Sequence, residues 1–271
     1  MTLKSLLGRT LPYLCLMPLL TMCLPAWAGD FLDQLNDTER AWLADHPVIK
    51  MTGDPDWLPQ EGFTPDGRQV GIVADLLDVL EQRLGVEFER VVPDDWNDAV
   101  RLAESGEVDI LSETTGTSRK GLVFTEPYLK FAVAIIVRND ASTIRNPDGL
   151  KGKRVAVVRG YGYVEIFQQQ YPDLDYLEVD SVRDGLLAVS AGHADAFLSA
   201  TSTASYLISQ LGLANLQFSG FTGLTIDLGF GVRQEQKLLF GLLQKALNSI
   251  SDDEMRRIQE RWVNLNAGQQ Q

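Results

Sequence analysis

One stretch of the sequence occurs twice, and this repeat constrains the fold more than any other feature. The copies are WNDAVRLAESGEVDILSE, which starts at Trp96, and VRDGLLAVSAGHADAFLS, which starts at Val182, so they align without a gap at an offset of 86 residues. Each copy reads as an amphipathic helix, a glycine that ends the helix, and a buried strand. The repeat therefore predicts two α/β units of similar structure.

Chance is the alternative explanation, because helix–glycine–strand units are common in α/β proteins. Three residue pairs are identical at this offset: Asp98 with Asp184, Gly106 with Gly192, and Asp109 with Asp195. A predicted strand also precedes each helix, which favours repetition of a whole unit over chance.

The remaining segments favour parallel sheets covered by helices. GIVADLLDVLEQRLG, residues 71–85, has its apolar residues at helical spacing and ends on Gly85. AIIVR and RVAVV are β-branched runs typical of strands that are buried on both faces. Strands that alternate with helices of this length predict parallel α/β sheets.

Hydroxyl side chains follow both repeated strands. Ser112, Glu113, Thr114 and Thr115 come after the first strand, and Thr201 comes after the second. Because ligands bind outside the carboxyl ends of the strands in open parallel sheets, we expect these two ends to face each other across a ligand-binding cleft. The hydroxyls would donate hydrogen bonds to the ligand, or they would only cap helices and turns. Glu113 is either a ligand acceptor or a charge at the start of a helix.

The first 28 residues read as a signal peptide rather than as part of the fold. Lys4 and Arg9 precede an apolar run over residues 11–24, and Ala26-Trp27-Ala28 forms a small-x-small cleavage site. The run is shorter than the roughly 20 residues of a membrane span and is interrupted by proline. An uncleaved anchor is the alternative. We expect cleavage after Ala28 and export to the periplasm.

The mature chain would keep 243 of the 271 residues, a length that suits two lobes or one large α/β domain. Both cysteines, Cys15 and Cys23, lie in the removed segment, which excludes disulfides and cysteine catalysis. A lipid anchor on Cys23 is the alternative fate of that residue. Loss of Lys4 and Arg9 takes the net charge from −13 to −15. Such a surface repels nucleic acid and anionic lipid, so neither is an expected partner.

Seven motifs in order carry a resemblance to a known family: TERAWLADHPVIKM, DPDWLPQEGF, GIVADLL, GEVDILSETT, FTEPY, GKRVAVVRGYGY and GHADAF. With them the chain resembles type II periplasmic solute-binding proteins, the bacterial extracellular solute-binding protein family 3, from about Leu35 to Val263. It is most similar to the Venus-flytrap sensor branch, which is found outside the membrane in histidine kinases and diguanylate cyclases. The resemblance implies an α/β fold of two lobes, with two hinge crossovers, that closes on a small ligand.

The resemblance also implies where the domains begin and end. We expect a lead-in helix at 29–45, a discontinuous first lobe at 46–137 and 226–265, a second lobe inserted at 138–225, and a disordered tail at 266–271.

Two residues of the first lobe match positions that contact the ligand in this family. Trp57 lies where the family offers an aromatic plate, and the alternative is a core tryptophan that seals the lobe. Amino-acid binders of the family also keep an arginine that forks onto the ligand carboxylate. Arg119 is the candidate for that role, but alignment on Phe124 places Ser118 there, so the carboxylate clamp stays open.

The second lobe offers a glycine-rich turn. RVAVVRGYGYVEIF reads as strand, turn and helix, and Gly160 leaves room for backbone N–H groups to face an anion. Arg159 and Tyr161 border this turn and either reach the cleft or cover the lobe surface. Amino-acid binders carry an aspartate for the ligand ammonium where this chain has Ala200, and Asp180 or Asp227 is a candidate replacement. The sequence therefore does not identify an ordinary amino acid as the ligand.

The sequence contains no pattern typical of a catalytic or metal site. His46 and His193 lack metal-ligand spacing and a nucleophile partner, so we expect solvated turn residues and neither a metal nor a cofactor. Some enzymes share the fold, among them dehydratases that act on prephenate-like acids, and Glu113 would be the acid–base group of such an enzyme.

The expected function follows from these observations. We expect a non-enzymatic monomer that binds a small polar metabolite, either amino-acid-like or a carboxylate. Its partner would be the permease of an ABC transporter or a membrane-bound sensor kinase or cyclase.

Overall fold

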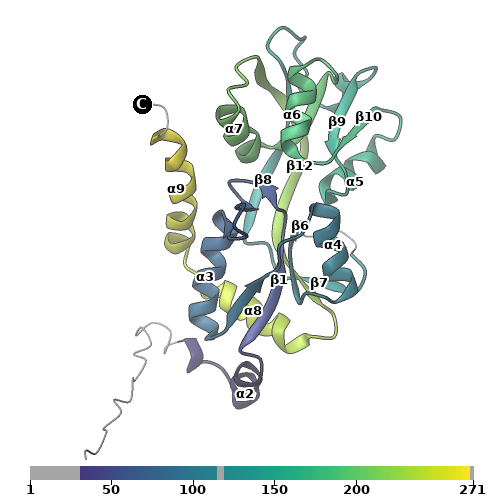
Figure 1. Ribbon diagram of the computed structural model, residues 1–271. Helices are drawn as coiled ribbons and strands as arrows, with labels where there is room; N and C mark the ends of the chain where they lie inside the picture. The colour runs from purple at the N-terminus through teal and green to yellow at the C-terminus, as the bar shows by residue number, and fades with distance from the viewer. Residues whose placement is uncertain (1–30, 115–118, 269–271) are drawn as a thin grey trace, which may run out of the picture.

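The computed structural model describes residues 31–114 and 119–268, without the side chains of Glu113, Thr114 and residues 263–268. The fold is α/β, with helices packed on a nine-stranded sheet of order β10-β9-β11-β8-β12-β6-β1-β5, in which β7 also pairs with β12 (Figure 1). The strands of this sheet are β1 (Val48–Thr52), β5 (Glu87–Arg90), β6 (Ile110–Thr114), β7 (Leu122–Phe124), β8 (Leu129–Arg138), β9 (Arg154–Val158), β10 (Asp175–Val179), β11 (Ala196–Ala200) and β12 (Leu216–Arg233).

A second sheet and the helices complete the structure. The small sheet has three strands, β2 (Asp56–Trp57), β3 (Glu61–Phe63) and β4 (Gln69–Val70). The helices are α2 (Asp37–Asp45), α3 (Ile72–Leu84), α4 (Trp96–Ser105), the 3-10 turn η1 (Pro147–Leu150), α5 (Gly162–Gln170), α6 (Val182–Ser190), α7 (Thr201–Gln210), α8 (Lys237–Asn248) and α9 (Asp252–Gly268). Within the described ranges, none of these helices is long and apolar enough to cross a membrane.

Two antiparallel strands, β8 and β12, run through the middle of the molecule and connect its two halves (Figure 1). We call the half built on β1, β5, β6 and β7 lobe 1 and the half built on β9, β10 and β11 lobe 2. Within each lobe the strands away from β8 and β12 pair in parallel. The prediction of a two-lobed, parallel-rich α/β fold with two crossovers is confirmed.

The repeated sequence forms the same structure in both lobes. Helices α4 and α6 begin at Trp96 and Val182, and strands β6 and β11 begin at Ile110 and Ala196, so both pairs keep the offset of 86 residues. The glycines after the helices, Gly106 and Gly192, have φ angles of 80° and 79°, the left-handed conformation that ends a helix.

The aspartates of the repeat make the same contact in both lobes. The Asp109 carboxylate accepts from the backbone N–H of Lys50 in β1 at 3.0 Å, and the Asp195 carboxylate accepts from that of Arg154 in β9 at 2.8 Å. Each aspartate therefore ties its strand to the neighbouring parallel strand in the same way.

The expected lobe boundary at 137 and 138 stays a prediction, and it lies at the end of β8, whose last residues pair with lobe 2. Residues from Val133 to Val137 pair with β11 of lobe 2, so the first crossover lies before Val133. The return crossover is marked by a register shift between Phe221 and Thr225, next to the expected division at 225 and 226. At the carboxyl end, α9 extends to Gly268 and covers the first three residues of the expected tail. The expected signal peptide lies outside the described residues.

Helix α9 packs along α3 on the outer face of lobe 1 (Figure 1). The Trp262 indole donates to the Asp75 carboxylate at 3.0 Å, and Arg83 forms an ion pair with Glu254 at 2.7 Å. The Arg83 side chain is nearly buried, so this ion pair is shielded from water and holds the start of α9 against α3.

Candidate ligand-binding site

A cavity lies between the two lobes, at the carboxyl ends of strands β1 and β6. About 260 Å³ of space lies between its walls, part of it open to solvent, and the centre of a water molecule has only about 20 Å³ to move in, which is room for about one water. Its walls come from lobe 1 and lobe 2 and consist of Asp54, Trp57, Glu61, Trp96, Ser112, Tyr161 and Tyr163.

Trp57, in β2, forms part of the lobe 1 wall. Its side chain is 6% exposed and meets the rings of Phe131 and Tyr161 edge-on, at centroid distances of 6.3 and 6.2 Å. Trp57 is therefore both a buried core residue and an aromatic wall of the cavity, so the two interpretations from the sequence describe one position.

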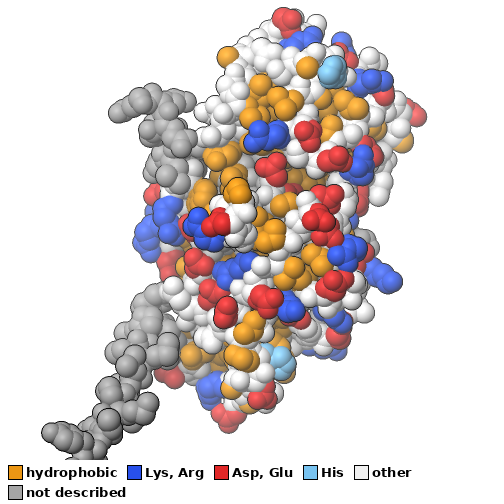
Figure 2. Space-filling view, viewed as in Figure 1, with side chains coloured by type: hydrophobic (Ala, Val, Ile, Leu, Met, Phe, Trp, Pro, Cys, Tyr) orange, Lys and Arg blue, Asp and Glu red, His pale blue; other side chains and the backbone are white. Residues whose placement is uncertain are grey.

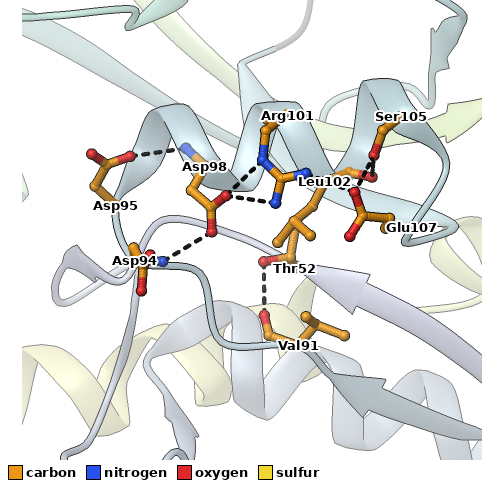
Figure 3. Close-up of polar contacts among 9 residues, drawn as sticks. All are labelled: Thr52, Val91, Asp94, Asp95, Asp98, Arg101, Leu102, Ser105 and Glu107. Atoms are coloured by element: carbon orange, nitrogen blue, oxygen red, sulfur yellow. Dashed lines mark hydrogen bonds and ion pairs between the residues drawn. The ribbon is translucent and has the colours of Figure 1, made fainter.

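Trp96 forms a second aromatic wall and is the first residue of α4. The Asp95 carboxylate caps this helix by accepting from the backbone N–H of Asp98 at 2.8 Å, and the Asp98 carboxylate accepts from the N–H of Asp94 at 3.1 Å (Figure 3). Because Trp96 is the first residue of the helix, this capping fixes its position. Its indole Nε1 donates to the carbonyl oxygen of Gly160 in lobe 2 at 2.9 Å.

Two buried carboxylates line the cavity from lobe 1. Asp54 is 5% exposed and Glu61 is 1% exposed. The backbone N–H of Asp54 donates to Glu61 Oε1 at 3.0 Å, so the two side chains are neighbours. Neither residue was among the candidates from the sequence, because an aspartate before proline and a glutamate before glycine read as ordinary turn residues.

Asp54 also bonds across the cleft. Its Oδ1 accepts from the backbone N–H of Asp56 at 2.9 Å, and its Oδ2 accepts from the Tyr161 hydroxyl of lobe 2 at 2.5 Å. Burial raises the pKa of Asp54 to about 6, and the Tyr161 hydrogen bond offsets part of this rise. Burial and the Asp54 charge raise the pKa of Tyr161 far above its usual range, so its hydroxyl remains a donor.

Gln60 makes a second bond between the lobes. Its fully buried side chain donates from Nε2 to Ser202 Oγ at 2.5 Å and accepts at Oε1 from Thr203 Oγ1 at 2.7 Å. Both hydroxyls lie in the first turn of α7, which begins at Thr201 and has no side-chain cap of its own. The amide of Gln60 therefore satisfies polar groups of lobe 2 at the start of this helix.

Arg119 also reaches lobe 2. Its Nη2 donates to the Gly160 carbonyl oxygen at 2.8 Å, its Nη1 pairs with Glu165 at 3.2 Å, and its guanidinium carbon lies 5.9 Å from the centre of the Trp96 ring. These contacts join the lobes beside the cavity, and Arg119 is not one of the residues that line it.

Among the described residues, four sets of polar contacts thus connect the lobes around one small cavity, so the two lobes are closed over it. The contacts are made by Asp54 with Tyr161, Gln60 with Ser202 and Thr203, Trp96 with Gly160, and Arg119 with Gly160 and Glu165.

The sequence-predicted residues fall into four groups, of which Arg159, away from the cavity, is the last. Trp57, Ser112 and Tyr161 line the cavity. A second group lies beside the cavity: Arg119 donates to the Gly160 carbonyl oxygen, and Thr201 is the first residue of α7. The side chains of Glu113 and Thr114, and the whole of Thr115, lie outside the described part of the chain.

Arg159 and the proposed replacements for the ammonium site lie elsewhere. Arg159 is exposed and pairs with Glu178 at 3.1 Å and with Asp180 at 2.7 Å. Asp227 pairs with Lys130 at 3.2 Å. None of these side chains lines the cavity, and among the side chains that the structure describes, the acid groups that face it are Asp54 and Glu61.

The histidines lie outside this cavity. His46 stacks on the Trp42 ring at a centroid distance of 4.1 Å, at the end of α2, and His193 lies in the exposed turn before β11. Among the residues that the structure describes, no group of three or more histidine, cysteine, aspartate or glutamate side chains is placed to hold a metal ion.

Two α/β lobes that close over a cavity define a binding protein of the Venus-flytrap type. Residues 49–265 match the family model of bacterial extracellular solute-binding proteins, family 3. The chain belongs to this family.

Similar proteins include a sensor protein and an L-cystine-binding protein. The chain is 30% identical to the virulence sensor protein BvgS of Bordetella pertussis over 227 residues. This alignment covers 83% of the chain and 18% of the sensor protein. The crystal structure of the periplasmic VFT2 domain of BvgS has a TM-score of 0.77 and 30% identity, and the match covers 84% of this chain and 98% of that domain. The L-cystine-binding protein TcyJ of Escherichia coli is 24% identical over 202 residues, which cover 73% of this chain and 75% of TcyJ.

These similarities confirm the sensor branch of the family as the one that the chain resembles. The chain spans about a fifth of the length of the BvgS sensor protein.

Proposed function

We propose that this protein binds a small polar metabolite in the periplasm, without turning it over, and passes the closed or open state of its lobes to a membrane partner. The observation that carries the proposal is the cavity that both lobes line, with hydrogen bonds from one lobe to the other on its sides. A molecule in this cavity contacts both lobes only when they are closed, so binding is coupled to their relative position.

The similarity to BvgS favours signalling through a membrane sensor kinase or cyclase as the use of this closure. The similarity to TcyJ over most of its length supports a second candidate, delivery of the ligand to the permease of an ABC transporter. Deletion of the gene distinguishes the two, because loss of a transport protein abolishes uptake of the ligand and loss of a sensor changes gene expression while uptake continues.

Binding is tested by titrating fractionated polar metabolites into the purified mature protein while tryptophan emission and the melting temperature are recorded. We expect an active fraction to raise the melting temperature and to change the emission of Trp57 and Trp96, which line the cavity. Trp57→Phe should reduce the emission change. Trp262→Phe is the matched control, because Trp262 contacts Asp75 on the outer face of lobe 1. The proposal fails if acids, amines, sugars and amino acids all leave both signals unchanged.

The enzyme alternative needs an acid–base group in the cleft. Prephenate-like acids incubated with the protein should be recovered unchanged if the binding proposal holds. Consumption of such an acid with multiple turnovers, abolished by Glu113→Gln, would replace the binding proposal by the enzyme.

A further inference from the structure

The charge of the cavity has one sign. The described lining side chains are two carboxylates, two tryptophans, two tyrosines and one serine. None of them is a lysine, an arginine or a histidine. Arg119, which the sequence offered as a clamp for a ligand carboxylate, instead contacts Glu165 and the Gly160 carbonyl. An anionic group placed here would face Asp54 and Glu61 in a site from which most water is excluded, and that arrangement is strongly unfavourable.

The surroundings of the cavity are acidic as well. The charges of Asp56 and Asp95 both act to raise the pKa of Asp54. The cation that acts on Asp56 is Arg183 of lobe 2, and the neighbouring Asp184 opposes it. Acidic side chains also occur on the visible surface of both lobes (Figure 2), in line with the net charge of −13 for the whole chain. This field attracts cations toward the cleft.

The aromatic walls suit a cation too. Trp57, Trp96, Tyr161 and Tyr163 line the cavity, and the negative face of an aromatic ring attracts a cation within about 6 Å of its centre. Trp96 already has such a neighbour, because the Arg119 guanidinium lies 5.9 Å from its ring centre.

Tyr161 occupies the position that a ligand donor would take. Its hydroxyl donates to Asp54 Oδ2 at 2.5 Å, and the remaining space holds about one water. A ligand must therefore displace this hydroxyl to reach Asp54. An ammonium or guanidinium N–H can do so, because it brings a full positive charge to the Asp54 carboxylate, whereas the Tyr161 hydroxyl is a neutral donor.

We propose that the cavity binds a small organic cation, a primary amine or a guanidine without a carboxylate, with Asp54 and Glu61 as its counter-charges and the aromatic walls around its body. This inference rests on the proposed binding function and specifies the ligand class of the same site. Such a ligand needs no carboxylate clamp and no aspartate at position 200.

Three compounds with the same four-carbon chain test the proposal by calorimetry at pH 7.5. They are 1,4-diaminobutane, 4-aminobutanoate and butanedioate, and shorter and longer amines, tyramine and agmatine extend the cationic arm. We expect at least one amine or guanidine to bind, the zwitterion with the same chain to bind at least about 10-fold more weakly, and the dicarboxylate not to bind. If carboxylates or zwitterions bind as tightly as amines, the cation proposal is overturned while the binding function stands. If no polar metabolite of any class binds, both proposals fail.

Variants test the assigned contacts with the amine that binds best. Asp54→Asn should weaken binding at least about 10-fold, whereas Asp140→Asn should leave it unchanged, because Asp140 is exposed and pairs with Arg138. Tyr161→Phe removes the competing donor and should tighten binding about 2- to 10-fold, the range expected for one hydrogen bond. Tyr176→Phe is its control, since that hydroxyl bonds to the Tyr171 carbonyl within lobe 2. Weaker binding to Tyr161→Phe, or unchanged binding to a folded Asp54→Asn protein, would overturn the proposal.

Discussion

Replacing Gln60 by alanine removes the contact that joins lobe 1 to α7. The fully buried amide makes one hydrogen bond to Ser202 and one to Thr203, and Thr203 is itself fully buried. Two hydrogen bonds contribute about 2 kcal/mol, and an unpaired buried hydroxyl adds about 1–2 kcal/mol to the loss. Because both bonds connect the lobes, the cost of about 3–4 kcal/mol falls on the closed form and shifts the equilibrium toward the open form roughly 100- to 1000-fold.

The distance between the lobes reports this shift. The expected mature chain has no cysteine, so Glu87→Cys in lobe 1 and Asp173→Cys in lobe 2, both at exposed positions, provide unique sites for two dyes. We expect the ligand-free parent protein to give one short-distance population by energy transfer, and the Gln60→Ala variant to give a longer one. A lower melting temperature should accompany the change.

Gln217→Ala is the control for this experiment, because Gln217 is exposed and its amide makes only a long bond of 3.5 Å within lobe 2. The reasoning is refuted if Gln60→Ala keeps the short distance and the parent melting temperature.

Three further predictions concern the effect of pH on closure, the backbone geometry at two glycines and the hydrogen bond of Asp195. The pKa of Asp54 is about 6 in the closed form, against the ordinary value of 3.8, so the closed form binds a proton more tightly than the open form does. Protonation therefore stabilises the closed form by about 3 kcal/mol below pH 4, and this stabilisation is lost as the pH rises through 6. Dye distances in ligand-free protein should therefore shorten as the pH falls from 7 to 5, and Asp54→Asn should remove this dependence; an equal pH response in the variant counts against the account. Gly192→Ala should lower the free energy of unfolding by about 1 kcal/mol, because the backbone φ angle at Gly192 is 79°. Gly241→Ala in α8 should raise the free energy of unfolding by about 0.5–1 kcal/mol, because there is open space around the new Cβ. Denaturant titration that gives the same sign for both variants would contradict this. Asp195→Ala should cost about 1 kcal/mol in the same titration, and no loss relative to Asp140→Ala would show that its bond to Arg154 is not stabilising.

The repeated sequence predicted the helices and strands of both lobes well, because these elements are determined by patterns of neighbouring residues. Apolar periodicity and the glycine stops act within about 20 residues, and the structure keeps them at the same offset in both lobes. The residue at which the chain passes from lobe 1 to lobe 2 is harder to predict, because β8 is one continuous strand whose residues from Val133 to Val137 pair with β11 of lobe 2. Its pairing with β11 and β12 depends on segments more than 50 residues away in sequence, and no local pattern marks the residue at which the strand leaves lobe 1.

The cavity was only partly predictable for a related reason. Trp57, Ser112 and Tyr161 follow strands or border a turn, so rules for strand ends find them. Gln60 and Glu61 are polar residues before and at the start of the short strand β3, and such residues are normally exposed. The side chain of Gln60 is bonded to lobe 2, which is a contact across about 140 residues of sequence.

A crystal structure of the mature protein grown with a saturating amine or guanidine tests the account most directly. It predicts electron density for the ligand between the rings of Trp57 and Trp96, with a nitrogen within hydrogen-bond distance of Asp54 and with contacts to residues of both lobes. Density for the bound ligand on an outer surface, with the Tyr161 hydroxyl still bonded to Asp54, would contradict it.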